Sequence, residues 1–336
     1  MRAISLPEVA YGATAVRPSW EDLPAALRDA ISSRLGGPIM AATSAGGGFT
    51  RAFAAVLTTA SGDRAFVKAA PMTEPLADWY SREAVITSAL PPEVPAARPR
   101  WTLVAADHFV LCLDAVDGRV PALPWASADL NAALRAWEAA AAALSKPPAE
   151  LLSLGLPPLS DIVRGELSWW SEIAAGRVPL PPAPAWVPGR LGELAALERG
   201  LPGLVAGTGM LHGDLRVDNV LLDRYGGAWL CDWTWPCLGA PWFDTVTLLV
   251  TAYASGLDVD AALAPWEAPG EGVDGALAAL GGYWLTRAAG GPSSASPHSR
   301  QHQRFSGRQA LAWLAERRGW ASDETSDGTS DRASAG

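Results

Sequence analysis

Cysteine and basic charge are scarce in this sequence. Its 336 residues include three cysteines, Cys112, Cys231 and Cys237, and no two of them have the CxxC spacing of a zinc site or a redox dithiol. The formal net charge is −9 and the isoelectric point is near 5.0, which argues against a nucleic-acid-binding protein that relies on a basic face. An acidic balance is compatible with a cationic partner, but acidic proteins serve many functions.

Long hydrophobic runs are also missing. The most apolar stretch, VTLLVTAYASGL at 246–257, is shorter than the roughly 18 residues of a membrane span and is predicted to form a buried helix. The first 16 residues contain no continuous apolar core of the kind that a signal peptide needs. We therefore expect a soluble protein of the cytoplasm, with reduced cysteines and with neither a membrane nor a nucleic acid as its partner.

Strand signals dominate the first third of the chain. Apolar runs at 51–58 and 64–69 flank the turn Ser61-Gly62-Asp63 and predict a hairpin. Two more strands are expected at 100–105 and 108–114, with a helix at 81–90 before them. An earlier helix is predicted to begin at Ser19, where Asp22 would complete a capping box.

Helical patterns dominate the remainder. Helices are predicted from Ser127 and at 160–175, 190–200, 242–256, 272–288 and 306–318. The segment at 290–303 is expected to be a flexible loop, and 321–336, poor in apolar residues, a disordered tail. This order predicts an α+β fold of two lobes. A small antiparallel-sheet N-lobe would span 1–115, and a larger, mainly helical C-lobe would span 116–320.

A polar island, LHGDLRVDNVLLD at 211–223, lies inside the helical part. A strand, a turn at 225–227 and a returning strand should follow, which would bring Asp214, Asn219 and Asp232 to one end of a hairpin. Asp and Asn also favour turns for their geometry alone. Three converging oxygen-bearing side chains nevertheless make a site for a hard cation such as Mg²⁺. One carboxylate could remain free of metal and act as a base.

The island has the layout of a kinase catalytic loop, H-x-D-x4-N followed by an Asp after a hairpin. With His212-Gly213-Asp214 in place of HRD and with the pair Asp232-Trp233, it resembles the aminoglycoside phosphotransferase and choline kinase-like family, whose fold is similar to that of protein kinases. The resemblance covers about residues 40–255 and is strongest at 211–244. The sequence departs from the family at 216–218, Arg-Val-Asp, where many relatives have a His-Pro-Gly-like run.

The resemblance implies supporting residues outside the island. Lys68, on the second strand of the first hairpin, would hold the α- and β-phosphates of ATP, and Glu83 in the next helix would orient it. Glu74 is the competing partner, but it lies before Pro75 and in an expected loop. Further along, Asp244 at a helix start would cap that helix and brace the catalytic loop.

The resemblance also implies where the nucleotide lies. The turn at Gly46, Gly47 and Gly48 stands where the phosphate-covering loop belongs, and it is not a Walker A loop because no G-K-[ST] follows. The apolar run at 110–119 would be the hinge between the lobes. Backbone groups around Asp114 and Val116 would then hydrogen-bond the adenine.

Each residue of the catalytic loop receives a role by the same resemblance. Asp214 would orient the acceptor hydroxyl and accept its proton, while Asn219 and Asp232 would hold Mg²⁺ against the triphosphate. His212 would support the loop by hydrogen bonding rather than act as the base. Arg216 is a candidate for stabilising the charge that develops on the phosphate.

The resemblance thus implies an ATP-dependent phosphotransferase acting on the hydroxyl of a small molecule. The acceptor stays open, because a polycationic aminoglycoside needs carboxylates and a sugar or apolar metabolite needs aromatic walls. The carboxylate candidates are Asp161, Glu166, Glu172 and Asp218. The aromatic candidates are Trp169, Trp170, Trp186, Trp235 and Trp242.

Other functions remain open alongside this one. The chain could be a catalytically silent nucleotide-binding protein, a kinase of an amino alcohol or sugar, or a metal-dependent phosphohydrolase that uses the same Asp cluster. The presence of all five kinase residues argues against the silent protein. The lack of His-rich metal spacing argues against the phosphohydrolase. ATP versus GTP and the oligomeric state are not determined by the sequence.

Overall fold

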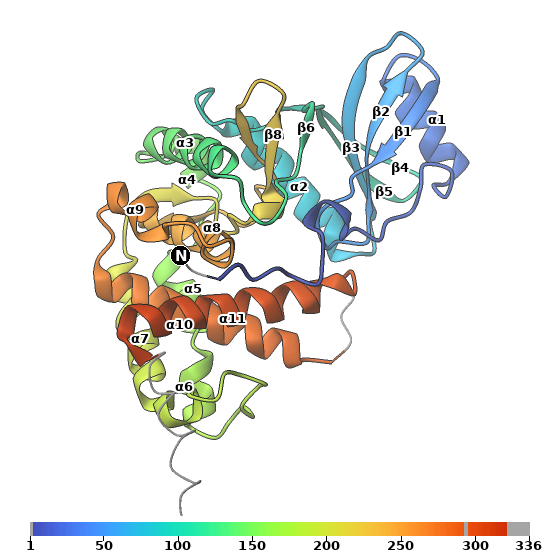
Figure 1. Ribbon diagram of the computed structural model, residues 1–336. Coiled ribbons are helices and arrows are strands. Elements are labelled where there is room, and N and C mark those ends of the chain that lie inside the picture. The colour runs from blue at the N-terminus through green and yellow to red at the C-terminus, as the bar shows by residue number, and fades with distance from the viewer. Residues whose placement is uncertain (1–2, 292–294, 321–336) are drawn as a thin grey trace, which may run out of the picture.

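The computed structural model describes residues 3–291 and 295–320, and the chain folds into two lobes (Figure 1). The N-lobe is built on a five-stranded antiparallel sheet with the strand order β1-β2-β3-β5-β4. Its elements are α1 (Ala25–Arg34), β1 (Ile39–Ser44), β2 (Phe53–Thr59), β3 (Arg64–Pro71), α2 (Pro75–Ala89), β4 (Pro99–Ala105) and β5 (His108–Asp114).

Alternation along β3 directs its side chains to opposite faces of the sheet. Ala65 and Val67 pack in an apolar cluster with Ile31 of α1. Phe66 packs on the other face, in a cluster that contains residues of α2. Because residues two apart on a strand share a face, Lys68 lies on the α2 side with Phe66. The alternation of side chains along β3 therefore places Lys68 on the side of the sheet that faces the space between the lobes.

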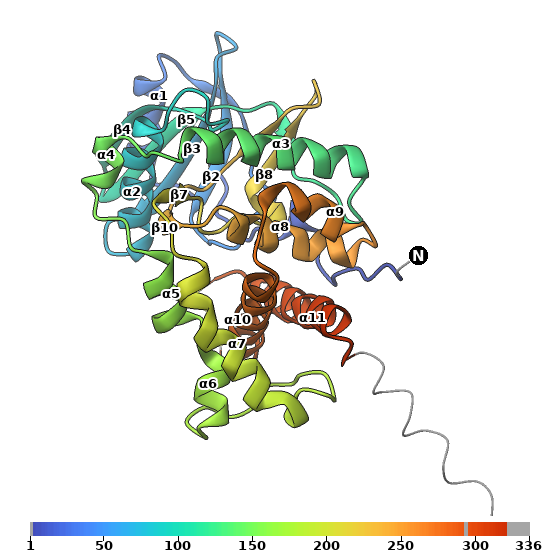
Figure 2. The same cartoon turned by 90° about the vertical axis from the view of Figure 1, so that its left-hand side faces the viewer.

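The C-lobe is mainly helical and carries two small antiparallel sheets. Its helices are α3 (Ser127–Ala143), α4 (Ala149–Leu152), α5 (Leu159–Glu166), α6 (Trp169–Ala174), α7 (Leu191–Leu204), α8 (Trp242–Ala254), α9 (Val259–Leu263), α10 (Gly270–Ala289) and α11 (His298–Arg318). One sheet pairs β7 (Gly209–Leu211) with β10 (Cys237–Gly239), and the other joins β6 (Gly118–Arg119), β8 (Val220–Asp223) and β9 (Ala228–Leu230). Figure 2 shows α5, α7, α10 and α11 gathered below these strands.

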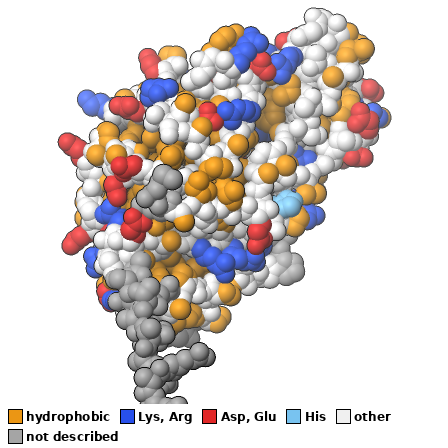
Figure 3. Space-filling model, viewed as in Figure 1, with side chains coloured by type: hydrophobic (Ala, Val, Ile, Leu, Met, Phe, Trp, Pro, Cys, Tyr) orange, Lys and Arg blue, Asp and Glu red, His pale blue; other side chains and the backbone are white. Residues whose placement is uncertain are grey.

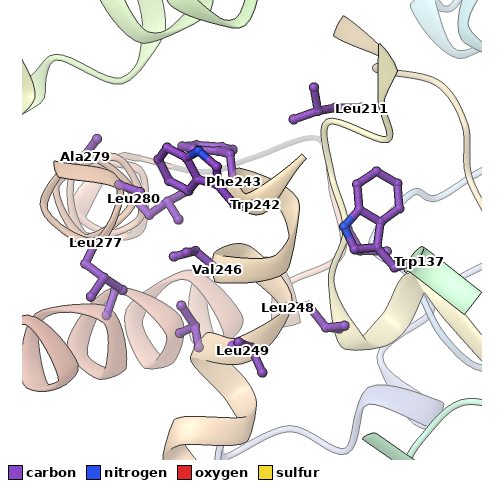
Figure 4. Packing of buried hydrophobic residues seen from close by; sticks show 14 of the residues in the cluster. Trp137, Leu211, Trp242, Phe243, Val246, Leu248, Leu249, Leu277, Ala279 and Leu280 are labelled. Atoms are coloured by element: carbon purple, nitrogen blue, oxygen red, sulfur yellow. The ribbon is translucent and has the colours of Figure 1, made fainter. Parts of the chain in front are cut away.

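Helix α8 forms the centre of the C-lobe core. Every one of its residues is buried, as the apolar run predicted. Figure 4 shows Phe243 and Val246 on the side of Leu277 and Leu280 of α10. This packing gives the catalytic loop, which precedes α8 in the chain, a rigid support.

The surface of the described residues carries charge of both signs. On the face shown in Figure 3, Lys and Arg side chains lie beside Asp and Glu in small groups. None of the helices within 3–291 and 295–320 combines the length and the hydropathy that crossing a bilayer requires.

Two expectations about secondary structure were wrong, and one strand was missed. Asp22 accepts hydrogen bonds from the backbone and the hydroxyl of Ser19, but this turn precedes α1, whose N-cap is Pro24. The helix expected at 160–175 is two helices, α5 and α6, with a break around Leu167. Strand β1 was not predicted, because its residues are mostly exposed and show no apolar alternation.

The expected flexible loop at 290–303 was also wrong over its second half. Helix α11 begins at His298, and its polar first turns are held by tertiary contacts, since Ser299, His302 and Ser306 are buried. A polar sequence gives no sign of a face that packs on other polar or aromatic groups. The tail expected at 321–336 lies outside the described residues.

The N-terminal segment crosses from the C-lobe to the N-lobe ahead of α1 (Figure 1). The Ser5 N–H donates to the Ala254 carbonyl at 2.8 Å, and the Ala15 N–H donates to the Gly46 carbonyl at 2.9 Å. Between these points, the Ser296 hydroxyl donates to the Thr14 carbonyl at 2.7 Å. The segment therefore connects the glycine-rich turn to the helical lobe.

Candidate active site

A cavity of about 1170 Å³ lies between the lobes. The N-lobe contributes the glycine-rich turn, β3, α2 and the hinge, and the C-lobe contributes the catalytic loop and parts of α5, α8, α10 and α11. Eleven of the twelve predicted site residues line it, and His212 lies behind the wall. These eleven are Gly46, Gly47, Gly48, Lys68, Glu83, Asp114, Val116, Asp214, Arg216, Asn219 and Asp232.

Lys68 is held by Glu83, as their sequence positions predicted. The Lys68 Nζ donates to both Glu83 carboxylate oxygens at 2.8 and 2.6 Å and lies 3.6 Å from the Asp232 Oδ1. Burial disfavours the ammonium, but the two carboxylates outweigh it and raise the pKa of Lys68 above its ordinary value. The competitor Glu74 is exposed and precedes α2. A permanently charged lysine thus faces the cavity beside Asp232.

Asp214 is held from two sides. The Arg216 Nη1 donates to its Oδ1 at 2.8 Å, and the Asn219 Nδ2 donates to its backbone carbonyl at 2.8 Å and to its Oδ2 at 3.2 Å. Arg216 also chelates Asp218 through two hydrogen bonds of 3.1 Å. In the segment where the sequence differs from the family, Arg216 therefore pairs with both Asp214 and Asp218. The arginine positions the Asp214 carboxylate.

Left-handed backbone brings the two acidic segments together. Gly213 has a φ of +79°, and a Cβ atom there would lie 2.0 Å from the Trp235 carbonyl oxygen, so a side chain is excluded. Asp232, a non-glycine residue, has a φ of +64°. The Cys231 N–H donates to the Asn219 carbonyl at 2.9 Å. This close approach puts Asp214, Asn219 and Asp232 at one end of the β8–β9 hairpin, as the spacing predicted.

His212 and Asp244 support the loop from behind. The Asp244 Oδ2 accepts from the backbone N–H groups of His212 at 2.7 Å and Gly213 at 3.2 Å, while the His212 Nε2 is 2.8 Å from the Cys231 carbonyl. Burial lowers the pKa of His212 to about 4, so the ring is neutral near pH 7. Asp244 braces the loop as expected, but it makes no cap for its own helix, whose N-cap is Pro241. The predicted capping role was wrong.

The glycine-rich turn is anchored by the N-terminal segment. The Gly47 carbonyl accepts from Arg17 at 3.0 Å and the Gly48 carbonyl accepts from the Thr14 hydroxyl at 3.1 Å. A Cβ at Gly46 would lie 2.1 Å from the Gly12 carbonyl oxygen, and Gly48 has a φ of +87°. At these positions glycine is required by close approach and by backbone conformation.

The hinge leaves β5 at Asp114. The Asp114 N–H donates to the Arg98 carbonyl at 2.9 Å, and its carboxylate pairs with Arg100 on the surface. This N–H is therefore used within the N-lobe, and the prediction that backbone groups around Asp114 and Val116 bond an adenine concerns the other backbone groups there. Both residues line the cavity.

The carboxylates at the centre have opposite pKa shifts. Burial raises the pKa of Asp214 to about 7, the charges of Asp218 and Asp232 add to the rise, and Arg216 opposes it. Burial also disfavours the Asp232 carboxylate, but Lys68 and the Thr234 hydroxyl hold its pKa below the ordinary value. A proton acceptor near neutrality thus lies beside a group that stays ionised.

A divalent cation fits the donor set of Asn219 and Asp232. The Asn219 amide nitrogen is used on Asp214, which leaves its oxygen as the ligand atom, and Asp232 is ionised. Among the described residues, no three His, Cys, Asp or Glu side chains form a metal-binding group. A hard cation here would therefore draw its other ligands from phosphate oxygens and water, as Mg²⁺ does.

Some of the residues predicted to contact the acceptor line the cavity and others do not. Asp161 and Glu172 pair with Arg164 and Arg177 on the surface and do not line it. Glu166 and Asp218 do line it. Of the five candidate tryptophans, only Trp235 is in the wall, where 47% of it is exposed.

An aromatic group at the cavity was not predicted. The His302 ring of α11 stacks on Phe49 at 5.0 Å and lies edge-to-face to Trp284 at 6.1 Å, while the Tyr11 hydroxyl is 2.7 Å from the His302 Nδ1. The Arg216 guanidinium lies 5.6 Å from the Phe49 ring. These residues come from five separate segments, so no spacing in the sequence could have indicated the contact.

We expect acid to destabilise the protein partly through His302. Burial lowers the pKa of His302 to about 3, with Arg216 adding to the shift and Asp218 opposing it. A histidine whose folded pKa lies below its unfolded value of about 6.5 supports folding above that value and loses this support as the pH falls. Between pH 7 and 5 the loss is about 2 kcal/mol.

Urea unfolding of the wild type and a His302→Gln variant from pH 8 to 5 measures this effect. The variant should lose less stability on acidification, by about 2 kcal/mol. Parallel curves for the two proteins would show that His302 does not titrate between the folded and unfolded states.

The matches to known proteins agree with this geometry. The model of the phosphotransferase enzyme family (APH) matches residues 42–283, which is most of the chain. The chain belongs to the phosphotransferase enzyme family. No curated protein matches it in sequence.

Solved structures of this phosphotransferase fold are similar at low sequence identity. A thermostable mutant of aminoglycoside phosphotransferase APH(4)-Ia, in a ternary complex with AMP-PNP and hygromycin B, has a TM-score of 0.59 at 13% identity and covers 88% of this chain and 99% of its own. The GDP complex of an aminoglycoside 2′-phosphotransferase-IIIa mutant has a TM-score of 0.57 at 16% identity, with 88% and 96% covered. Macrolide 2′-phosphotransferase MphH from Brachybacterium faecium has 0.51 at 15% identity, with 83% and 97% covered. These likenesses confirm the predicted two-lobed, kinase-like α+β fold.

Proposed function

We propose that this phosphotransferase moves the γ-phosphate of ATP to a hydroxyl of a small molecule in a Mg²⁺-dependent reaction. The observation that carries the proposal is the convergence of two units on one cavity. Lys68, Glu83 and Asp232 form the first unit, and Asp214 with Asn219 forms the second. Relatives whose names include ADP, AMP-PNP or GDP complexes support a nucleotide as the donor.

The roles of the residues follow from their positions. Asp214, held by Arg216 and Asn219, orients the acceptor hydroxyl and takes its proton as the oxygen bonds to the γ-phosphorus and ADP leaves. Lys68 binds the α- and β-phosphates. Asn219 and Asp232 would hold Mg²⁺, which supplies charge neutralisation at the phosphates when bound. Positioning and charge, rather than covalent chemistry, supply the rate.

The contacts support the role predicted for His212 and narrow the role predicted for Arg216. The hydrogen bonds of His212 hold the loop in place, so His212 is a positioning residue. Arg216 is already paired with Asp214 and Asp218, and its first role is to fix the base, with any contact to the transferring phosphate coming after that. The lobe boundary near 115 and a cytoplasmic location, where ATP is supplied, remain part of the proposal.

The names of the relatives favour an antibiotic as the acceptor, an aminoglycoside or a macrolide, and would then make the protein a resistance enzyme. A kinase of an amino alcohol or a sugar is the second candidate, since the same site would serve any hydroxyl. A silent nucleotide-binding protein is disfavoured because Lys68, Glu83, Asp214, Asn219 and Asp232 all line the cavity.

The test measures ATP use against a panel of aminoglycosides, macrolides, choline, amino alcohols and sugars, with mass spectrometry of the products. A product heavier than its acceptor by one phosphate, formed only with Mg²⁺ and ATP, is the expected result. Release of inorganic phosphate without any phosphorylated acceptor would indicate a phosphohydrolase. Failure of the protein to bind ATP would contradict the proposal as a whole.

A further inference from the structure

We infer that the acceptor is a hydroxyl compound with a broad apolar surface and at most one positive charge, rather than a polycation. The inference deepens the proposed function and rests on it. It comes from the side chains that line the C-lobe end of the cavity, beyond Asp214 from the nucleotide end.

That end of the cavity carries several apolar and aromatic side chains. Helices α5, α8, α10 and α11 contribute to its floor, and Figure 4 shows Phe243 of α8 and Leu280 of α10 near one another. The apolar side chains in the floor are Leu159, Ile162, Phe243, Leu280, Tyr283 and Trp284. The polar side chains that the same helices bring to the wall are Glu166, Thr247, Ser299, His302 and Gln303. The apolar part of such a wall gains affinity from buried apolar area, at about 25 cal/mol for each Å².

A polycation needs carboxylates that are free to pair with its amino groups, and two of those near the base already pair with Arg216. The Asp218 side chain is 0% exposed and is chelated by Arg216, and the same arginine pairs with Asp214. Among the charged side chains that α5, α8, α10 and α11 bring to the cavity wall, this leaves Glu166. A desolvated ammonium group without a carboxylate partner is strongly disfavoured, and one carboxylate can match one such group.

Positive charge also lies close behind the wall. The Arg287 guanidinium is 5.4 Å from the ring of Tyr283, and Tyr283 lines the cavity. A positive charge behind this wall opposes a ligand that carries several ammonium groups.

An exposed aromatic ring beside the base offers a platform for the apolar part of the acceptor. Trp235 is 47% exposed although it lines the cavity, and its carbonyl packs directly on Gly213, the residue before Asp214. The Trp79 ring of α2 lies 5.1 Å from it in an edge-to-face arrangement. Such a half-covered tryptophan gains contact area when an apolar surface closes over it.

The first experiment compares two probes by titration calorimetry and by phosphate transfer. Erythromycin presents a large lactone with a single amino group, and kanamycin A presents several amines on small polar rings. With AMP-PNP and Mg²⁺ bound, erythromycin should bind at least 10-fold more tightly than kanamycin A, and with ATP it should be the better acceptor. Tighter binding or faster phosphorylation of kanamycin A overturns the inference, as does the absence of erythromycin binding.

A second pair of probes isolates the effect of apolar surface area on affinity, because the two compounds differ only in their alkyl chain. Octyl glucoside and methyl glucoside carry the same sugar and no charge. Octyl glucoside should bind at least 10-fold more tightly, because its chain adds buried apolar area. Equal affinities overturn the inference.

Two variants then show which side chain of the cavity determines the affinity for the acceptor. Trp235→Ala should raise the KM for the apolar acceptor about 10- to 30-fold with an unchanged Kd for AMP-PNP, and it should fold, because the ring is half exposed. For erythromycin, Glu166→Gln should raise the KM less than Trp235→Ala does, because it removes the partner of a single amino group. A Glu166→Gln effect larger than that of Trp235→Ala assigns the site to a cation and overturns the inference. Failure to bind AMP-PNP overturns the proposed function itself, whereas a preference for polycations with AMP-PNP bound overturns only the inference about the acceptor.

Discussion

Replacing Asp214 by Asn should lower kcat/KM about 10³-fold while the Kd for AMP-PNP changes less than 3-fold. The carboxylate takes the acceptor proton in the proposed reaction, and an amide cannot. Two contacts limit the structural damage. Arg216 keeps its two hydrogen bonds to Asp218, and Asn219 still donates to the backbone carbonyl at 214. The loss should therefore appear in phosphate transfer and not in nucleotide binding or folding.

The measurement is acceptor-dependent ADP release at saturating ATP, with mass spectrometry of the product and a urea melt of the variant. Asp161→Asn is the matched control, because Asp161 pairs with Arg164 on the surface and does not line the cavity. Exposed ion pairs of this kind contribute about 0–1 kcal/mol, so the control should keep full activity. Transfer by Asp214→Asn as fast as by the wild type would show that another group accepts the proton.

Replacing Lys68 by Met should remove both activity and stability. The phosphates lose their cation, which should lower kcat/KM about 10²- to 10³-fold, with a large part of the loss in the KM for ATP. The Glu83 side chain, 2% exposed, would be left buried without its partner, a change that costs about 3–5 kcal/mol. Burial already raises the pKa of Glu83, so in the variant this carboxyl should take up a proton near neutral pH.

A second substitution separates the two losses. The double variant with Lys68→Met and Glu83→Gln leaves no buried charge, so it should recover most of the stability and none of the activity. Lys146→Met is the matched control, because Lys146 is the other lysine of the chain and is exposed. If the double variant unfolds as readily as the single one, the Lys68–Glu83 pair is not what stabilises this part of the N-lobe.

The two experiments bear on different parts of the proposal. A loss of transfer with nucleotide binding retained at Asp214→Asn supports its role as the base. A loss of nucleotide affinity at Lys68→Met supports the placement of the phosphates against β3. Neither substitution changes the side chains that α5 and α10 bring to the cavity wall.

Much of the central site could be predicted, because its residues are either close in sequence or placed by the alternation of side chains along a strand. The β8–β9 hairpin carries Asp214, Asn219 and Asp232 to one place, and turn chemistry and apolar runs are enough to indicate such a hairpin. The strand period places Lys68 on the α2 side of the sheet, where Glu83 on the next helix can reach it. The boundaries of these elements also came close, with strands expected at 64–69 and 108–114 and found at Arg64–Pro71 and His108–Asp114.

What the sequence could not decide involves contacts between distant segments. The helical state of 298–303 depends on His302 packing against Phe49 and Trp284, and neither residue is near it in the chain. The role of Asp244 as a brace rather than a helix cap depends on two N–H groups about thirty residues earlier. The pairing of Asp218 with Arg216 is local, since the two are neighbours in the loop, but its geometry depends on how that loop folds.

The chain by itself therefore determined the kind of chemistry, and the tertiary structure decided what that chemistry can act on. Phosphate transfer needs a base, an amide and a carboxylate at fixed spacing, and a loop with a hairpin supplies them locally. In the proposed reaction the acceptor would meet a wall to which four helices contribute. These helices are far apart in the sequence, and only the folded chain shows that they meet at one cavity.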